Sequence, residues 1–99
     1  MVAMGFRTVR HRVIKALRQG TYLHAARGNI EVKNALLTGD ISPGALIRII
    51  ERCNGTHYES SRHHQIEGID VHILKRDGWY VKFYFVDPET VFISVHRSR

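Results

Sequence analysis

Apolar and polar positions follow one period in the first half of the chain and another in the second. In the first half, apolar residues recur every three or four positions, as at Val9, Val13, Ala16 and Leu17, which is the spacing of an amphipathic helix. In the second half, apolar and polar residues alternate in four stretches, as in strands with one buried face. This order predicts one α+β domain over 1–99, with about three N-terminal helices packed on one face of a four-stranded antiparallel sheet.

Residues that favour helix ends separate the predicted helices. Serine, threonine and asparagine cap helix N-termini, proline fits the first helical position, and glycine commonly follows the last. The expected start and stop signals are Thr8 and Gly20 for the first helix, Asn29 and Gly39 for the second, and Ser42-Pro43 and Asn54-Gly55 for the third. The predicted strands are 56–63, 69–75, 79–86 and 91–97, the last three forming a meander.

The most apolar predicted strand, "WYVKFYFV", has a lysine at its centre. Burying an unpaired ammonium group is strongly unfavourable, so Lys82 is expected to face away from the core. Bringing the apolar faces together then requires a three-residue loop, 76–78, which pairs Val81 with Ile73, and another odd-numbered loop before the last strand. The predicted buried set is Trp79, Val81, Phe83, Phe85, Val71, Ile73, Ile93 and Val95, packed on Leu17, Leu36, Leu46 and Ile50.

In this register three titratable side chains, His72, Lys82 and His96, form a row across the exposed face of the sheet. Side chains opposite each other on neighbouring strands are roughly 4.5–5.5 Å apart at Cβ, so the three are expected to reach one substrate group. Two imidazoles beside an ammonium suit metal-independent RNA cleavage: one group removes the 2′-hydroxyl proton, another protonates the leaving 5′-oxygen, and the cation stabilises the phosphorane. The alternative is a solvated sheet face without a site.

Aromatic and basic residues extend this predicted site. Tyr80 and Tyr84 are expected on the same face, where tyrosines can stack on unpaired bases. No cofactor is expected, and no metal, because the adjacent His63 and His64 of one strand point to opposite faces and no cysteine pair accompanies them. The remaining candidate RNA-binding residues are Tyr58, Arg62, Arg76 and Arg97.

The charge balance narrows the choice of partners. Fifteen lysines and arginines against nine acidic residues give a formal net charge of +6, and eleven of the fifteen are arginine. Arginine binds phosphate and carboxylate groups with a planar fork, which favours RNA or an acidic protein as partner; a solvated basic surface is the alternative. The chain has no apolar run as long as a membrane span and no secretory signal, and its single cysteine, Cys53, suits a reducing compartment. These features predict a cytoplasmic protein without membrane contact.

Several stretches follow one another along the chain in a recognisable order: "VIKALRQG", "ALLTG", "RII", "HYESS", "DVHIL", "YVKFYF" and "FISVHR". Together they resemble the MqsR family of toxin ribonucleases. The resemblance implies a RelE-like fold, cleavage of messenger RNA and inhibition by a cognate antitoxin. At the family's site positions Tyr80 and Lys82 match, and His96 stands in place of a lysine. Glu59 and Ile69 depart from the family, which has a lysine and a glutamine there. A further stretch, "LHAARGNIEVKNALLTGDI", resembles DUF4258-type domains, which share the helices-then-sheet plan.

The leading hypothesis is therefore a metal-independent endoribonuclease toxin that cleaves single-stranded messenger RNA and is covered by an acidic antitoxin. One alternative is a catalytically silent module that binds RNA or DNA through the same basic, aromatic face. Another is a small protein whose positive surface only docks an acidic partner. Toxicity on expression separates the first hypothesis from the other two, and salt-dependent RNA binding without cleavage favours the second.

Overall fold

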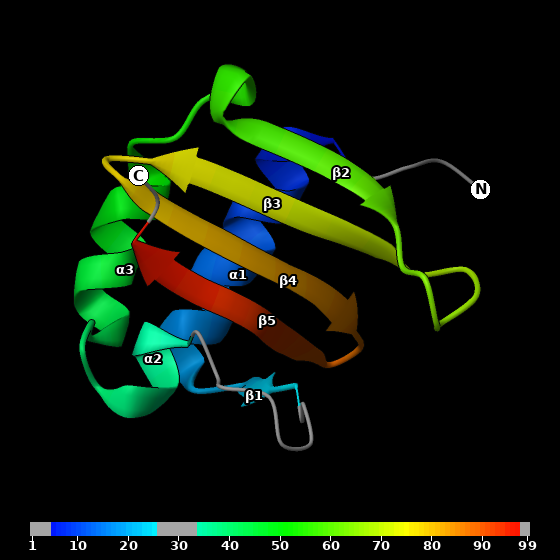
Figure 1. Ribbon diagram of the computed structural model, residues 1–99, viewed down its shortest axis with the longest axis horizontal. Helices are drawn as coiled ribbons and strands as arrows, with labels where there is room; N and C mark the ends of the chain where they lie inside the picture. Colours follow the sequence, from blue (N-terminus) through cyan, green and yellow to red (C-terminus); the bar gives the residue numbers. More distant parts are fainter. Residues whose placement is uncertain (1–4, 26–33, 98–99) are drawn as a thin grey trace.

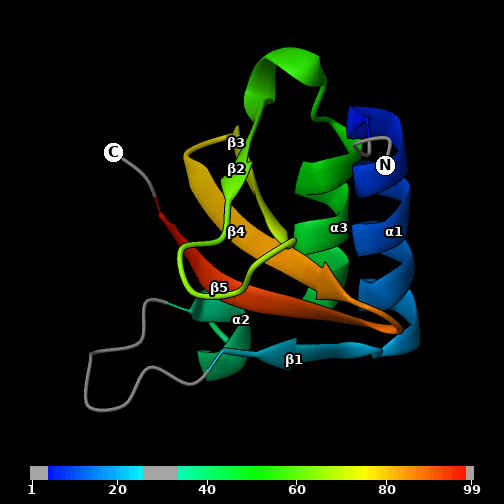
Figure 2. The same ribbon diagram turned by 90° about the vertical axis from the view of Figure 1, so that its right-hand side faces the viewer.

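The computed structural model describes residues 5–25 and 34–97. Its elements in chain order are α1 (Phe6–Gln19), β1 (Tyr22–His24), α2 (Ala35–Thr38), α3 (Pro43–Glu51), the 3-10 turn η1 (Gly55–His57), β2 (Tyr58–Arg62), β3 (Asp70–Arg76), β4 (Trp79–Val86) and β5 (Glu89–Arg97). The strands form one sheet in the order β1-β5-β4-β3-β2 (Figure 1). Helices α1 and α3 lie together against one face of this sheet (Figure 2). None of the helices in the described ranges is long and apolar enough to cross a membrane.

The α+β class is as predicted, whereas the sheet has a fifth strand. Strand β1 pairs in parallel with β5, with Tyr22 opposite Thr90 and His24 opposite Phe92, so the sheet is mixed rather than purely antiparallel. A three-residue strand contains too few positions to show an alternating pattern. The sequence analysis therefore missed it.

Helix α1 buries the predicted stripe of Val9, Val13, Ala16 and Leu17 and ends at Gly20, whose φ of 74° is left-handed. It begins earlier than expected, with Gly5 rather than Thr8 as its N-cap and no side-chain hydrogen bond to the cap. The first turn is stabilised by packing instead, because the Phe6 ring lies 5.6 Å from the ring of Tyr58. Tertiary packing thus outweighs the local capping signal.

Helices α2 and α3 begin with side-chain caps. Asn34 caps α2 by accepting a hydrogen bond from the Leu37 N–H at 3.0 Å, while the expected cap Asn29 lies outside the described residues. The third helix opens as predicted, with Ser42 Oγ accepting from the Ala45 N–H at 3.1 Å. It ends at Glu51, and Asn54 begins η1 rather than closing the helix, because its side chain caps that turn.

The hairpin between β3 and β4 has a two-residue turn, and the predicted three-residue loop is wrong. Asp77 and Gly78 have φ values of 54° and 78°, which suit the type I′ turn that joins twisted strands. Leu74 therefore faces Val81 and His72 faces Phe83. This register turns His72 and Leu74 toward the helices and Val71 and Ile73 to the opposite face. The two-residue turn therefore sets the register of β3 and β4, and the apolar residues of β3 do not all lie on one face as expected.

The second hairpin also departs from the expected odd-numbered loop, because Val86 pairs with Glu89 across a two-residue turn. Farther along, Phe83 pairs with Phe92 but Lys82 pairs with Ser94, so the register shifts at a β-bulge. Residue 93 is the extra residue of β5. The shift leaves Phe92 and Val95 on the helix side, opposite Phe83 and Val81 respectively.

The core lies between the sheet and the two long helices. Phe83 is fully buried there, as predicted. Val81, Phe85 and Val95 also belong to the core, together with Leu17, Leu36, Leu46 and Ile50. Trp79 is only partly buried, and Leu74 and Phe92 take the inner places expected for Val71, Ile73 and Ile93. Val71 is buried as predicted, but on the opposite face of the sheet, across from Tyr84.

Candidate nucleic-acid interface on the outer face of the sheet

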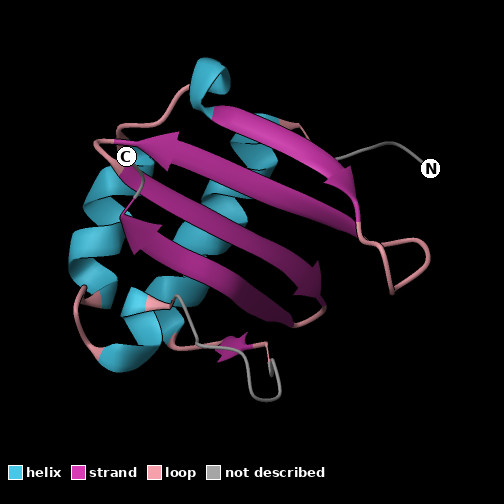
Figure 3. Cartoon of the chain, viewed as in Figure 1, coloured by secondary structure: helices cyan, strands magenta, loops and turns pink. Residues whose placement is uncertain are grey.

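The side of the sheet turned away from α1 and α3 is called the outer face here. In Figure 3 it faces the viewer, and no helix of the described residues lies over it. Strand pairing places Lys82 on this face, between Ile73 on β3 and Ser94 on β5. The expected position of Lys82 on the side opposite the core is confirmed. The other polar and aromatic side chains of the outer face are Glu59, Ser61, Lys75, Tyr80, Tyr84, Glu89 and His96.

Tyr80 and His96 form a stacked pair on this face. They are register partners on β4 and β5, and their ring centroids lie 4.9 Å apart at an interplanar angle of 19°. On the β3 side, the Lys75 ammonium lies 5.9 Å from the Tyr80 ring centroid and 3.0 Å from a carboxylate oxygen of Glu59. A flat aromatic surface beside a cation is therefore present on the outer face.

The tautomer of His96 follows from its hydrogen bond. Its Nδ1 lies 2.9 Å from the Arg97 carbonyl oxygen, and a carbonyl can only accept, so Nδ1 carries the proton. In the neutral ring Nε2 then holds a lone pair. Nε2 is the atom with which His96 can take a proton from a substrate.

Lys82 lies near His96 but not directly opposite it. Ser94 is the register partner of Lys82, and His96 is two residues farther along the same strand. Such diagonal neighbours stand about 7–8 Å apart and remain within reach of long side chains. Within residues 5–25 and 34–97, the Lys82 ammonium makes no ion pair or hydrogen bond with a side chain. It is half-buried and available to an anionic ligand.

Tyr84 lies at the other end of the outer face, under the segment that follows β2. The His63 ring meets the Tyr84 ring edge-on, with centroids 5.0 Å apart. His63 Nδ1 accepts hydrogen bonds from the N–H groups of Gln65 and Ile66 at 3.0 and 3.1 Å. These bonds fix the His63 ring over Tyr84, so this edge of the face is bordered by a second aromatic pair.

His72, predicted to lie beside Lys82, is instead on the helix side of the sheet. It is 2% exposed, and its Nδ1 lies 2.8 Å from the Tyr58 hydroxyl. Its ring packs against Phe83 and Phe85, with centroids 5.7 and 5.3 Å away. Burial lowers the pKa of His72, an effect that Asp70 opposes and Arg12 reinforces. A buried histidine with a hydrogen-bond partner is stable in a core, so the row of His72, Lys82 and His96 does not exist.

Tyr58 shares this inner position and is not at the margin of the outer face. Its ring stacks on His72 and touches Phe6. Burial raises the pKa of the Tyr58 hydroxyl, so the hydroxyl stays protonated. Arg62, opposite Asp70, is exposed at the end of β2 on this same side. Neither residue extends the outer face as predicted.

The other two candidate arginines lie near the end of the sheet where β4 begins. Arg76 Nη1 lies 3.0 Å from His57 Nε2, and its Nε lies 3.6 Å from an Asp77 oxygen. The Arg97 guanidinium lies 5.1 Å from the centroid of the Trp79 ring. Arg76 is therefore held within the protein, whereas Arg97 covers the ring of its register partner Trp79, which packs against the core side of the sheet.

A hollow of about 350 Å³ lies beside Arg97, between the start of α2 and the end of β5. Its lining residues are Asn34, Ala35, Thr38, Asp40, Trp79, His96 and Arg97. The sequence analysis found His96 and Arg97 but missed Thr38, Asp40 and Trp79 as part of a site. Their proximity depends on the pairing of Asn34 with Val95, and no local pattern indicates a contact between residues so distant in sequence.

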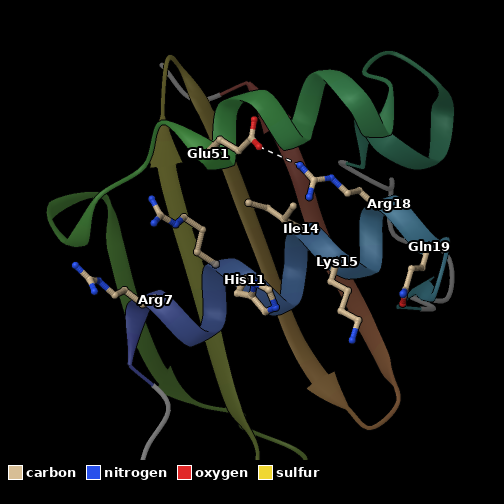
Figure 4. A pocket seen from close by; sticks show the side chains of 8 residues that line it. Arg7, His11, Ile14, Lys15, Arg18, Gln19 and Glu51 are labelled. Atoms are coloured by element: carbon tan, nitrogen blue, oxygen red, sulfur yellow. Dashed lines mark hydrogen bonds and ion pairs between the residues drawn. The ribbon is translucent and has the colours of Figure 1, made fainter.

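A second basic surface lies on the helix side of the molecule. It is an open hollow of about 670 Å³ along α1 and α3, shown in Figure 4. Its lining residues are Arg7, Arg10, His11, Ile14, Lys15, Arg18, Gln19 and Glu51. Arg18 pairs with Glu51 at 3.1 Å, and Arg10 donates to the Cys53 carbonyl at 3.0 Å. Four of these lining residues are arginine or lysine and one is glutamate, and none is tyrosine, tryptophan or phenylalanine.

Comparison with protein-family models, curated proteins and solved structures finds no match to this chain. In the described part of the chain, no three histidine, cysteine, aspartate or glutamate side chains are grouped so as to hold a metal ion. The groups of the outer face that can take part in chemistry are its lysine, imidazole and tyrosine side chains.

Proposed function

We propose that the outer face binds single-stranded RNA and cleaves it without a metal. The observation that carries this proposal is the position of Lys82 and His96 on one face, diagonal to each other, with Tyr80 stacked on His96. Exposed aromatic rings next to cations are the usual means of holding unpaired bases and their phosphates. Tyr80 and Tyr84 provide the rings, and Lys82 provides a cation without a carboxylate partner among the described residues.

The proposed reaction uses the substrate's own 2′-hydroxyl as the nucleophile. The 2′-oxygen forms a bond to phosphorus as the bond from phosphorus to the 5′-oxygen breaks. His96 Nε2 accepts the 2′-hydroxyl proton, and the Lys82 ammonium stabilises the charged phosphorane and gives a proton to the departing 5′-oxygen. The products are a 2′,3′-cyclic phosphate and a 5′-hydroxyl. Solvent then removes the proton from His96 and returns one to Lys82.

This scheme differs from the sequence-based expectation in its second proton carrier. His72 is buried on the other side of the sheet, so Lys82 takes that role. Glu59, which departs from the resembled family, lies 3.0 Å from Lys75. Lys75 offsets the charge of Glu59, and Lys82 is the cation of this face that is available to a phosphate.

The test is cleavage of an unstructured, end-labelled RNA in the presence of EDTA. We expect cleavage by the wild-type chain, none of a DNA of the same sequence, and a loss of roughly 10²–10⁴-fold in rate for His96→Ala. His11→Ala is the matched control, because His11 is exposed on α1, away from the outer face. Binding without cleavage would favour a silent RNA-binding module. Cleavage that EDTA abolishes, or that His96→Ala leaves unchanged, would contradict the mechanism.

A second function is supported by the helix-side hollow. We infer that an acidic segment of a protein partner, an antitoxin in the cell, covers this hollow, because four of its residues are arginine or lysine against one glutamate. A surface without large aromatic rings suits carboxylates better than unpaired bases. Lys15→Glu should weaken co-purification with a partner encoded beside this chain. Arg48→Glu, exposed on α3 outside the hollow, should not. Equal binding by both variants would contradict this position for the partner, and a chain harmless on expression without any such partner would contradict the toxin role.

A further inference from the structure

The hollow between α2 and the end of β5, called the β5 pocket here, has two charged groups of opposite sign that are not paired with each other. Asp40 accepts a hydrogen bond from the Thr38 hydroxyl at 2.9 Å. Within the described ranges its carboxylate has no cationic partner, and the Arg97 guanidinium has no carboxylate partner. Both line the same hollow of about 350 Å³. A pocket with a carboxylate that has no cationic partner and a guanidinium that has no carboxylate partner can bind a ligand that offers a donor to the first and an acceptor to the second.

The flat surfaces of the β5 pocket narrow the class of ligand. Trp79 and His96 both line it. The Arg97 guanidinium is held over the Trp79 ring at 5.1 Å, and the His96 ring is held by its stack on Tyr80 at 4.9 Å. Planar walls with polar groups at the edge are features of sites that bind nucleobases.

Among the four RNA bases, guanine alone matches both charged groups. Its N1–H and N2 amino group form a donor pair that one carboxylate can accept, and its O6 and N7 form an acceptor pair that an arginine fork can meet. Adenine lacks the O6 acceptor, and cytosine and uracil lack N7. We propose that the β5 pocket binds a guanine of the RNA strand, with Asp40 at its Watson–Crick edge and Arg97 at its O6 and N7.

This assignment rests on the proposed function, because the strand must lie on the outer face to present a base to the pocket. His96 lines the β5 pocket and also belongs to the outer face. A guanine bound here would therefore be next to the group proposed to remove the 2′-hydroxyl proton. The pocket then selects where the strand is cut as well as how tightly it binds.

The experiment measures binding alone, so that it does not depend on cleavage. The probes are fluorescent heptamers of 2′-O-methyl uridine with a single central guanine, adenine, inosine or 7-deazaguanine. Their 2′-oxygens cannot attack phosphorus. Bidentate recognition of a base typically discriminates by about 5- to 150-fold, so the guanine heptamer should bind at least about fivefold more tightly than the adenine heptamer. Inosine, which lacks the N2 amino group, and 7-deazaguanine, which lacks N7, should each lose part of that preference.

Two variants assign the preference to atoms. In Asp40→Asn the difference between guanine and inosine should disappear, and in Arg97→Ala the difference between guanine and 7-deazaguanine should disappear. Asp70→Asn removes the same charge from an exposed position outside the β5 pocket and should keep the full guanine preference. Tight binding of all heptamers without a guanine preference would overturn this inference and leave RNA binding intact. A difference between guanine and inosine that persists unchanged in Asp40→Asn would overturn it as well. Failure to bind any heptamer would overturn the proposed function and this inference with it.

Discussion

The hydroxyl of Tyr58 and Nδ1 of His72 lie 2.8 Å apart on the helix side of the sheet, and the two rings are stacked with centroids 5.9 Å apart. His72, which was predicted to be exposed, is buried, and Tyr58 provides the hydrogen-bond partner for its Nδ1. It also removes one imidazole from the predicted catalytic row. Its consequence for the molecule is in stability rather than catalysis.

Stability should fall at mildly acidic pH because of His72. Its pKa in the folded protein is lowered by burial, so the unfolded chain binds the proton more readily. The contribution is complete above the ordinary histidine pKa of about 6.5 and is lost as the pH falls from there toward the lowered folded value. Urea unfolding between pH 8 and pH 5 should show this loss, and His72→Gln should reduce it. If the stability of His72→Gln fell between pH 8 and pH 5 as much as that of the exposed variant His64→Gln, a group other than His72 would cause the pH dependence.

Phe83 should be among the most sensitive core positions. It is fully buried and contacts Phe85 and Phe92 with ring centroids 5.6 and 5.8 Å apart. Phe83→Ala should lower the free energy of unfolding by about 3–5 kcal/mol, measured by chemical denaturation. Val86→Ala, on the same strand but 45% exposed, should change it by less than about 0.5 kcal/mol. Similar losses for both would place Phe83 outside the core.

The turn between β3 and β4 requires a left-handed residue at Gly78, where φ is 78°. Gly78→Ala should destabilise the protein by about 1–2 kcal/mol, because a side chain is strained in that conformation. Gly44→Ala is the contrasting variant, since Gly44 lies in α3 with open space around its Cα. It should raise stability by about 0.4–1 kcal/mol. Thermal unfolding of the two variants should therefore shift in opposite directions, and a tolerated Gly78→Ala would contradict the two-residue turn.

Lys82 should contribute to RNA binding through charge. Each cation that neutralises a phosphate of a single strand contributes about 0.7 to the slope of log affinity against log salt concentration. Lys82→Ala should therefore reduce the size of this slope by about 0.7, in addition to lowering affinity and cleavage. Titration of an unstructured RNA at several salt concentrations measures it. Arg48→Ala, which removes an exposed charge from α3, should leave the slope unchanged, and an identical slope for Lys82→Ala would exclude a phosphate contact.

Sequence patterns predicted the elements better than their register. The helix stripe of α1 and the Ser42 cap of α3 were readable because each depends on neighbours within a few positions. Strand β3 was ambiguous because Val71 and Ile73 alternate with His72 and Leu74, and either pair can form an apolar face once the histidine has a partner. The Asp77-Gly78 pair is a strong signal for a two-residue turn, and giving it more weight would have produced the observed pairing.

The candidate site was predicted in part for the same reason. Tyr80, Lys82 and Tyr84 depend only on alternation within β4, and the structure places all three on the outer face. His96 reaches that face because of the bulge, although the sequence analysis expected regular pairing. His72, Tyr58 and the β5 pocket depend on contacts between distant segments, which a single sequence does not reveal.

The extra residue of β5 reverses the alternation of side chains between the two faces of the sheet. Phe92 and Val95 both face the core although three positions separate them, because Ile93 interrupts the alternation. A regular strand that kept Ile93 would turn Val95 away from the core and His96 toward the helices. Deleting Ile93 would instead remove the bulge and leave Phe92 and Val95 on the core side and His96 on the outer face. The side on which His96 stands thus depends on the bulge being present whenever residue 93 is present.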